Sequence, residues 1–243
     1  MVKISLPLYT TIPESQDNRE MLKIIGHRGA RGLAPENTIA ALKVALRYKV
    51  DEVEIDVRCT KDHVAILSHD PSITGIMAER LAVHSHEFPE LRAHQPDLAT
   101  LSEAIKTVKR RVPIRIEVKQ HGVLQPVIRA VSEALATGCK PADFCFASFD
   151  YHILRALHTA FPDISLVVNE RWSGVRATSR ARRLQTRQLA MDQRFLWSGF
   201  IRIASHSGYS LTPYTVNDRE KAERWERYGI TGIVTDYPDR FVN

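Results

Sequence analysis

Short runs of apolar residues, each about as long as a β-strand, recur along the whole chain with helix-like segments between them. The runs are rich in Ile and Val and nearly continuous, which is typical of parallel strands that are buried on both faces. Parallel neighbours need a long crossover connection, and the helix-like segments provide one. The predicted strands are 23–27, 52–57, 64–68, 114–118, 144–147, 164–168, 200–203, 210–216 and 232–235, and the predicted helices are 38–47, 102–110, 124–136, 151–160 and 218–228.

This alternation predicts an α/β fold. Eight or nine strands without a break in composition favour a closed TIM (β/α)8 barrel over an open doubly wound sheet, so we expect residues 1–243 to form a single domain. Residues 1–20 are predicted to be a tail or a strap across the barrel floor, because Pro7 and Pro13 oppose regular structure.

One connection departs from the alternation. Only "RCTKDH" separates Val57 from Val64, which is too short for a helical crossover between parallel strands. We therefore predict that the second and third strands form an antiparallel hairpin. This hairpin would place Glu54 and Asp56 alongside residues 67–69.

Composition and charge limit the classes of molecule that the protein is expected to bind. The formal charge of +6 favours anionic ligands in general, but the sequence has no nucleic-acid-binding signature. No apolar run approaches the ~18 residues of a membrane span, and the N-terminal residues lack the apolar core of a secretory signal. Three scattered cysteines, Cys59, Cys139 and Cys145, fit a reducing compartment. We expect a cytoplasmic protein without a nucleic-acid partner.

The stretch "VEIDV" brings two carboxylates to one face of a strand. Side chains alternate along a strand, so Glu54 and Asp56 project together while their apolar neighbours face the other way. In a barrel interior the two charges would repel each other and lose water, and a bound cation would resolve that conflict. Oxygen ligands favour a hard ion such as Mg2+ or Ca2+ over zinc. The alternative is an amphipathic strand with its acidic face in water.

The stretch "RIEVK" repeats this pattern in another predicted barrel strand. Arg115, Glu117 and Lys119 alternate with apolar residues, so Glu117 is a candidate third carboxylate and Lys119 a cation nearer the mouth. Such an acid–base strand face is also common on protein surfaces.

Two histidines follow strands, where the active site of a barrel is found. His27 and Arg28 end the strand in "IIGHRGARGLAPENT", and His69 ends the strand in "AILSHD". A single such histidine is usually structural, but two can divide the acid and base roles of one reaction. Arg28 can grip phosphate oxygens in a forked geometry, and Lys119 and a cation can offset charge at phosphorus. Together these residues suit the cleavage of a phosphodiester.

The motifs resemble those of the glycerophosphodiester phosphodiesterase family. The similar segments are "GHRGARGLAPENT", "VEIDVRCTKDHVAILSHD", "ATLSEAI", "IEVK", "SFD", "YTVND" and "GITGIVTDYP", which follow one another from about Lys23 to Pro238. The segment 71–99 is a short divergent insertion before the Glu117 strand, because it lacks the family's usual Leu-Asp-x-Gly element.

The resemblance implies a TIM barrel that uses one divalent cation, Mg2+ or Ca2+ with Mn2+ as an alternative. It further implies hydrolysis of small glycerophosphodiesters to sn-glycerol 3-phosphate and an alcohol. By position in the motifs, Tyr214 stands in the substrate pocket where the family often has Trp. The other matching residues are the metal ligands Glu54, Asp56 and Glu117, the catalytic pair His27 and His69, and the phosphate-binding residues Arg28 and Lys119.

Two other functions stay open. Arg176, Arg180, Arg183 and Arg187 would form one cationic stripe if residues 170–194 are helical. A solvated helix face is the favoured interpretation, and contact with an anionic membrane surface is the alternative, with lysophospholipase D or sphingomyelinase D action on lipid phosphodiesters. The remaining hypothesis is a phosphate-ligand binding module without turnover. The oligomeric state and the alcohol group are not predicted.

Overall fold

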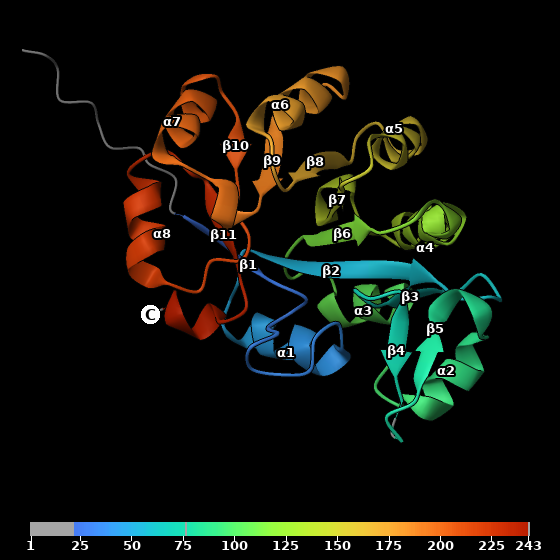
Figure 1. Ribbon diagram of the computed structural model, residues 1–243. Coiled ribbons are helices and arrows are strands. Elements are labelled where there is room, and N and C mark those ends of the chain that lie inside the picture. The colour runs from blue at the N-terminus through green and yellow to red at the C-terminus, as the bar shows by residue number, and fades with distance from the viewer. Residues whose placement is uncertain (1–21, 76, 243) are drawn as a thin grey trace, which may run out of the picture.

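A ring of parallel strands surrounded by helices dominates the computed structural model, which describes residues 22–75 and 77–242 (Figure 1). The predicted tail or strap at 1–20 lies outside the described residues. The parallel strands are β1 (Lys23–Gly26), β2 (Glu52–Cys59), β6 (Ile114–Val118), β7 (Phe144–Ser148), β8 (Ser165–Glu170), β9 (Gln188–Met191), β10 (Ser210–Leu211) and β11 (Gly232–Thr235).

The sheet runs in the order β10-β9-β8-β7-β6-β2-β1-β11, so its two edge strands must meet for the barrel to close. They meet just beyond β10, where Tyr214 bridges Val234 of β11 in parallel. The backbone NH of Val216 also donates to the Val234 carbonyl at 2.9 Å. The predicted TIM barrel is therefore confirmed, although its last seam is held by isolated bridges rather than by a long ladder.

The predicted hairpin is also confirmed. β3 (Ala65–Leu67) pairs antiparallel with β2, with Val57 opposite Leu67 and Cys59 opposite Ala65. The segment 71–99 follows it and contains β4 (Ser72–Thr74), β5 (Arg80–Ala82) and α2 (Phe88–His94). These elements lie together at the side of the barrel (Figure 1). They pack on β3 through a separate small apolar cluster of Ile66, Ile73, Val83, Leu91 and Leu98.

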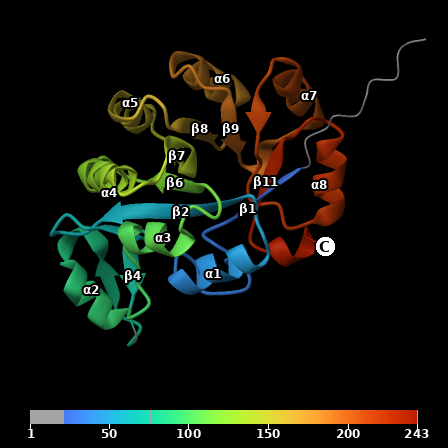
Figure 2. The ribbon, with the colours of Figure 1, turned by 180° about the vertical axis from the view of Figure 1, so that it is seen from behind.

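The remaining helices surround the barrel, as the view from behind also shows (Figure 2). Polar side chains cap the N-terminal NH groups of several of them, and Thr100 with Glu103 forms a complete capping box at α3. None of the helices in the described ranges is both long and apolar enough to cross a bilayer. The helices are α1 (Ile39–Arg47), α3 (Leu101–Val108), α4 (Leu124–Ala136), α5 (Tyr151–Ala160), α6 (Gly174–Arg183), α7 (Ser198–His206) and α8 (Arg219–Glu226).

One predicted strand is wrong, and one strand of the barrel was missed, as were the short strands β4 and β5 outside it. Residues 200–203 lie inside α7, where Ile201 and Ala204 are buried at the spacing of a helix rather than of a strand. The strand at this place in the barrel is β9, whose sequence QLAM contains no β-branched residue. The apolar run "FIRI" had the stronger strand composition, and only the packing of the barrel decides between the two.

Candidate active site

Three carboxylates meet inside the barrel where β2 and β6 lie side by side. Asp56 on β2 is in register with Glu117 on β6, and Glu54 lies two residues earlier on the same face of β2. Each of the three side chains is buried, and each offers an oxygen within 4.8 Å of the others. The structure thus brings together the three acidic residues that the strand alternation placed on one interior face.

Cations and amides neutralise part of this cluster. The ammonium of Lys119 lies 2.7 Å from Asp56 Oδ1 and also hydrogen-bonds to Glu117. Arg28 Nε lies 3.2 Å from Asp56 Oδ2, and Asn37 donates to the same oxygen at 2.9 Å. Burial acts to raise the pKa of Asp56, but Lys119, Arg28 and these hydrogen bonds outweigh it and lower the pKa below its usual value.

The other two carboxyl groups, those of Glu54 and Glu117, have too little positive charge around them to offset their burial. Burial, followed by repulsion from Asp56 and Glu117, raises the pKa of Glu54 well above its ordinary value. Burial likewise raises the pKa of Glu117, even though Lys119 opposes it. A divalent cation would favour the ionised form of both groups, so the donor set fits such an ion. Within the described residues, the buried Oδ1 of Asn169 also lacks a hydrogen-bond partner, while its Nδ2 donates to Glu117 at 2.9 Å.

His27 is oriented by the carboxylate that directly follows the last strand of the barrel. Its Nδ1 lies 2.6 Å from Asp236 Oδ1, and Asn217 donates to the other oxygen of Asp236 at 2.9 Å. Burial acts to raise the pKa of Asp236, but the hydrogen bonds from His27 and Asn217 lower it. An ionised carboxylate only accepts, so Nδ1 of His27 carries a proton and Nε2 is the nitrogen free for chemistry.

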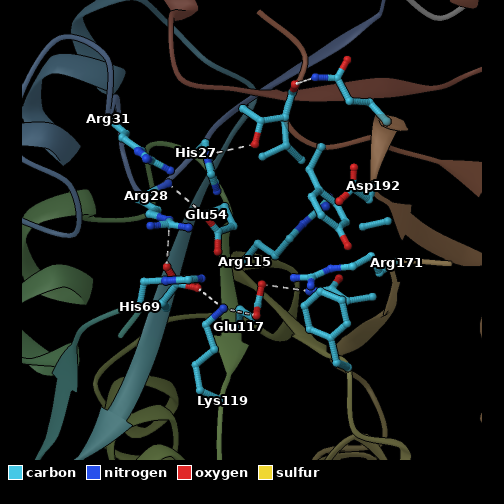
Figure 3. A pocket seen from close by; sticks show the side chains of 18 of the residues that line it. His27, Arg28, Arg31, Glu54, His69, Arg115, Glu117, Lys119, Arg171 and Asp192 are labelled. Atoms are coloured by element: carbon cyan, nitrogen blue, oxygen red, sulfur yellow. Dashed lines mark hydrogen bonds and ion pairs between the residues drawn. The ribbon is translucent and has the colours of Figure 1, made fainter. Parts of the chain in front are cut away.

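His69 has a similar partner. Its Nδ1 lies 2.8 Å from Asp70 Oδ1, and this hydrogen bond lowers the pKa of Asp70. Arg58 fixes the backbone here, because its Nε donates to the His69 carbonyl at 2.8 Å. In Figure 3, Glu54 lies between the two labelled histidines. Each imidazole is therefore held by an aspartate through Nδ1.

These groups line one cavity of about 380 Å³. His27, Arg28, His69 and Lys119 lie on the same side as the acidic cluster, and Arg171 and Asp192 lie across the cavity (Figure 3). Arg115, which shares a strand face with Glu117, is buried and paired with Glu52 at 2.5 Å, so its charge is already compensated.

Comparison with known proteins identifies the family. Residues 27–240 match the glycerophosphoryl diester phosphodiesterase family, which covers most of the chain. The chain belongs to this family. A glycerophosphodiester phosphodiesterase of Caldanaerobacter subterraneus subsp. tengcongensis is 26% identical over 236 residues, covering 90% of this chain and 96% of that protein.

Solved structures agree with this assignment. A phosphodiesterase of Oleispira antarctica, solved with its product sn-glycerol-3-phosphate, has a TM-score of 0.80 and 26% identity, covering 90% of this chain and 94% of that one. A glycerophosphodiester phosphodiesterase of Thermotoga maritima has a TM-score of 0.76 and 24% identity, covering 91% of this chain and 97% of that one. The family resemblance seen in the motifs is confirmed, and the protein is a phosphodiesterase of the hydrolase class.

Tyr214, the expected pocket residue of this phosphodiesterase, does line the cavity. Its hydroxyl donates to the Glu170 carbonyl at 3.1 Å, and its ring meets Phe149 edge to face at 6.2 Å between centroids. Tyr214 also makes the bridge that closes the barrel. One residue thus links the closing seam to the wall of the site.

The arginine stripe is not a single solvated face. Helix α6 ends at Arg183, so Arg187 lies beyond it. Arg176 binds the buried carboxylate of Glu170 with two nitrogens at 2.5 Å, and Arg180 lies 3.5 Å from it. Two of the four predicted members are therefore engaged in an ion-pair cluster at the rim of the barrel.

Several residues of the phosphodiesterase site were not predicted. Asn37 and Asp236 lie in the quoted motifs "GHRGARGLAPENT" and "GITGIVTDYP", but no role in the site was predicted for either residue. Asn169, Arg171 and Asp192 have no local pattern at all, because they reach the cavity only through the closure of the barrel. A polar residue at the end of a predicted strand was the one signal that could have found Asn169, which follows the predicted strand 164–168, but it could not have found Asp192, because the strand before it was not predicted.

Proposed function

We propose that this phosphodiesterase hydrolyses small glycerophosphodiesters to sn-glycerol 3-phosphate and an alcohol, with a divalent cation and two histidines. The observation that carries the proposal is the meeting of Glu54, Asp56 and Glu117 in one cavity with the two His–Asp pairs. The Oleispira antarctica phosphodiesterase, with its product sn-glycerol-3-phosphate, supports the same chemistry.

Glu54, Asp56 and Glu117 would hold the cation, with Mg2+ and Ca2+ favoured because all donors are oxygens. When bound, such an ion polarises a phosphoryl oxygen and offsets charge that develops at phosphorus. Arg28 and Lys119 border the same cluster and would hold the other phosphate oxygens. Of these two cations, Lys119 is the better placed to contact both the phosphate and the carboxylates, because its ammonium already lies between Asp56 and Glu117.

His27 and His69 divide the proton transfers. Since both Nδ1 atoms face aspartates, the Nε2 atoms are the ones that exchange protons with substrate. One imidazole takes the proton of the attacking oxygen, and the other protonates the leaving alkoxide. The attacking oxygen is either that of water or the 2-hydroxyl of the glycerol, which gives a cyclic phosphate first. Phosphorus NMR of the reaction separates the two, because only the second route forms a cyclic product.

The test is a panel of glycerophosphodiesters and bis-(p-nitrophenyl) phosphate, each with EDTA and with added Mg2+, Ca2+ or Mn2+. We expect turnover that is lost in EDTA and restored by a divalent ion. Glu117→Gln should abolish this response, while Glu170→Gln, a buried carboxylate outside the cluster, should keep it. Persistent inactivity of the folded protein across the panel would instead support a phosphate-binding module without turnover.

A further inference from the structure

Apolar side chains are exposed in a group at the mouth of the barrel. They lie in or next to the loops that follow β7, β8 and β9, at the same end as the catalytic residues. Trp172 and Trp197 are 61% and 63% exposed, and Val175 at the start of α6 is 81% exposed. We call this surface the aromatic rim, and its members are Phe149, Trp172, Val175, Phe195 and Trp197.

The members of the rim are close together. The rings of Trp172 and Phe195 lie 4.7 Å apart between centroids, so the loops after β8 and β9 touch. The starts of α6 and α7 are also adjacent, because a Cβ on Gly174 would lie only 2.2 Å from the Phe200 ring. Trp197 precedes α7 directly. The exposed aromatic residues of these two loops thus form one patch rather than scattered surface residues.

Arginines are interleaved with this patch, and the acids that pair with them lie beneath it. Arg176 and Arg194 have side chains that are 50% and 69% exposed, whereas their partners Glu170 and Asp192 are 1% and 7% exposed. The segments 171–180 and 193–197 contain four arginines and no acidic residue. The outer layer of the rim is therefore apolar and cationic at the same time.

The aromatic rim leads directly into the catalytic cavity. A hollow of about 300 Å³ lies between Phe149, Trp172 and Arg176. Phe149 and Arg171 line both this hollow and the catalytic cavity. A surface that covers the rim would consequently lie against the entrance to the active site.

We propose that the aromatic rim docks on an anionic lipid surface. Tryptophan rings favour the boundary between lipid headgroups and acyl chains, and arginines there bind lipid phosphates. A second copy of this chain fits less well, because a twofold interface would set the arginines of both rims against each other. The proposal concerns binding alone and holds for any chemistry at the cavity.

Sedimentation of the full chain with lipid vesicles tests it. One set of vesicles is an equal mixture of phosphatidylglycerol and phosphatidylcholine, and the other is phosphatidylcholine alone. We expect binding to the anionic vesicles at low salt, weaker binding at high salt, and little binding to the neutral ones. Tryptophan emission should shift to the blue on binding, and this shift reports Trp172 and Trp197 because Trp225 is already buried.

A double variant, W172S/W197S, should bind the anionic vesicles about tenfold more weakly, since it removes the two largest apolar contacts. The matched control, M77S/I203S, removes two apolar side chains that are also exposed but lie outside the rim, and it should bind like the original chain. Both variants should hydrolyse a soluble glycerophosphodiester at the original rate, because neither alters a residue of the catalytic cavity.

Three outcomes would overturn the proposal. One is an active enzyme that does not sediment with anionic vesicles, and another is equal binding by W172S/W197S. The third is a dimer in sedimentation velocity that W172S/W197S dissociates, which would assign the rim to contact between copies. Each of these leaves the proposed hydrolase function intact, whereas loss of turnover with intact vesicle binding would affect only that function.

Discussion

Buried carboxylates occur on two sides of the active-site cavity, and their charges are compensated differently. On the β8 and β9 side, Glu170 accepts two hydrogen bonds from Arg176, and Asp192 is bound by Arg194. On the β2 and β6 side, three carboxylates share Lys119 and Arg28. In Figure 3 Asp192 is across the cavity from Glu54 and His27. The two sides have the same type of residue, similarly buried, but they differ in how much positive charge lies next to each carboxylate.

The pKa shifts of these carboxyl groups reflect this difference. Burial acts to raise the pKa of Glu170, but hydrogen bonds from Arg176 and two backbone NH groups outweigh it and lower the pKa. The pKa of Asp192 is lowered in the same way by Arg194. The pKa of Glu54 and that of Glu117 are raised. Carboxylates with a full set of partners stabilise the fold, whereas carboxylates that lack one are suited to bind a cation.

The largest effect is expected from the two histidines beside the acidic cluster, to which we assign the proton transfers. His27→Ala or His69→Ala removes a proton transfer and should lower kcat about 10²–10⁴-fold. His84→Ala, at an exposed histidine of the 71–99 segment, is the matched control and should leave kcat unchanged. Steady-state rates on a glycerophosphodiester measure this. Near-normal turnover in both variants would remove the histidines from the mechanism.

The next largest effect is expected at Glu54, and it tests whether the acidic cluster lacks positive charge. Glu54 accepts a hydrogen bond from the Arg28 backbone NH at 2.9 Å but has no ion-pair partner among the described residues. In EDTA, Glu54→Gln removes this buried acidic group and should raise Tm by about 4 °C. With Mg2+ or Ca2+ at about a hundred times Kd, the unchanged protein gains about 2.7 kcal/mol that the variant cannot gain. The order of the two melting temperatures should then reverse. Calorimetry with and without the ion measures both Tm differences. A Tm of Glu54→Gln below that of the unchanged protein in EDTA would contradict the idea that the cluster lacks positive charge.

Glu170→Gln on the opposite side should have the reverse sign. The amide loses hydrogen bonds to a charged group and leaves Arg176 without its anion, so Tm should fall by about 4 °C in EDTA. The metal-induced rise in Tm should persist, because Glu170 lies outside the acidic cluster of Glu54, Asp56 and Glu117. A variant that lost the response to metal would show that the two sides do not act separately.

The two variants should also respond to pH in opposite directions. The folded pKa of Glu170 is lowered, so its contribution to stability is complete above the unfolded value of about 4.3 and is lost as pH falls through the folded value. The folded pKa of Glu54 is raised, so its ionisation destabilises the metal-free protein as pH rises from about 4.3. The Tm deficit of Glu170→Gln should shrink towards acid pH, and the Tm gain of Glu54→Gln should grow towards neutral pH.

The sequence predicts one side of the cavity much better than the other, for a physical reason. Glu54 and Asp56 share a face by the alternation of side chains along one strand, which needs no knowledge of distant contacts, and the family motif adds Glu117 to them. The short link between Val57 and Val64 likewise excludes a parallel crossover. By contrast, Asn169, which donates to Glu117, and Asp236, which holds His27, come from β8 and from the residue after β11, and they meet the site only when the barrel closes.

β9 and the segment 200–203 of α7 were mispredicted because local composition there opposes the final structure, whereas the predicted strand 164–168 corresponds to β8. The β9 sequence QLAM has weak strand preference, and the segment 200–203 has a strong one, yet the barrel makes a strand of the first and a helix of the second. Once β9 is missed, neither Asp192 at its end nor the contact between Trp172 and Phe195 can be anticipated. Tertiary closure, not propensity, determines this half of the site.

The smallest expected effect concerns Tyr214, which touches both sides. Its ring lines the catalytic cavity, and its hydroxyl donates to the Glu170 carbonyl at 3.1 Å. Tyr214→Phe keeps the ring and removes one hydrogen bond, so the free energy of unfolding should fall by about 0.5–1.5 kcal/mol with kcat nearly unchanged. Tyr214→Ala removes the wall as well and should raise KM. If Tyr214→Phe lowered kcat as far as a histidine variant does, the hydroxyl would belong to the catalytic machinery rather than to the seam that closes the barrel.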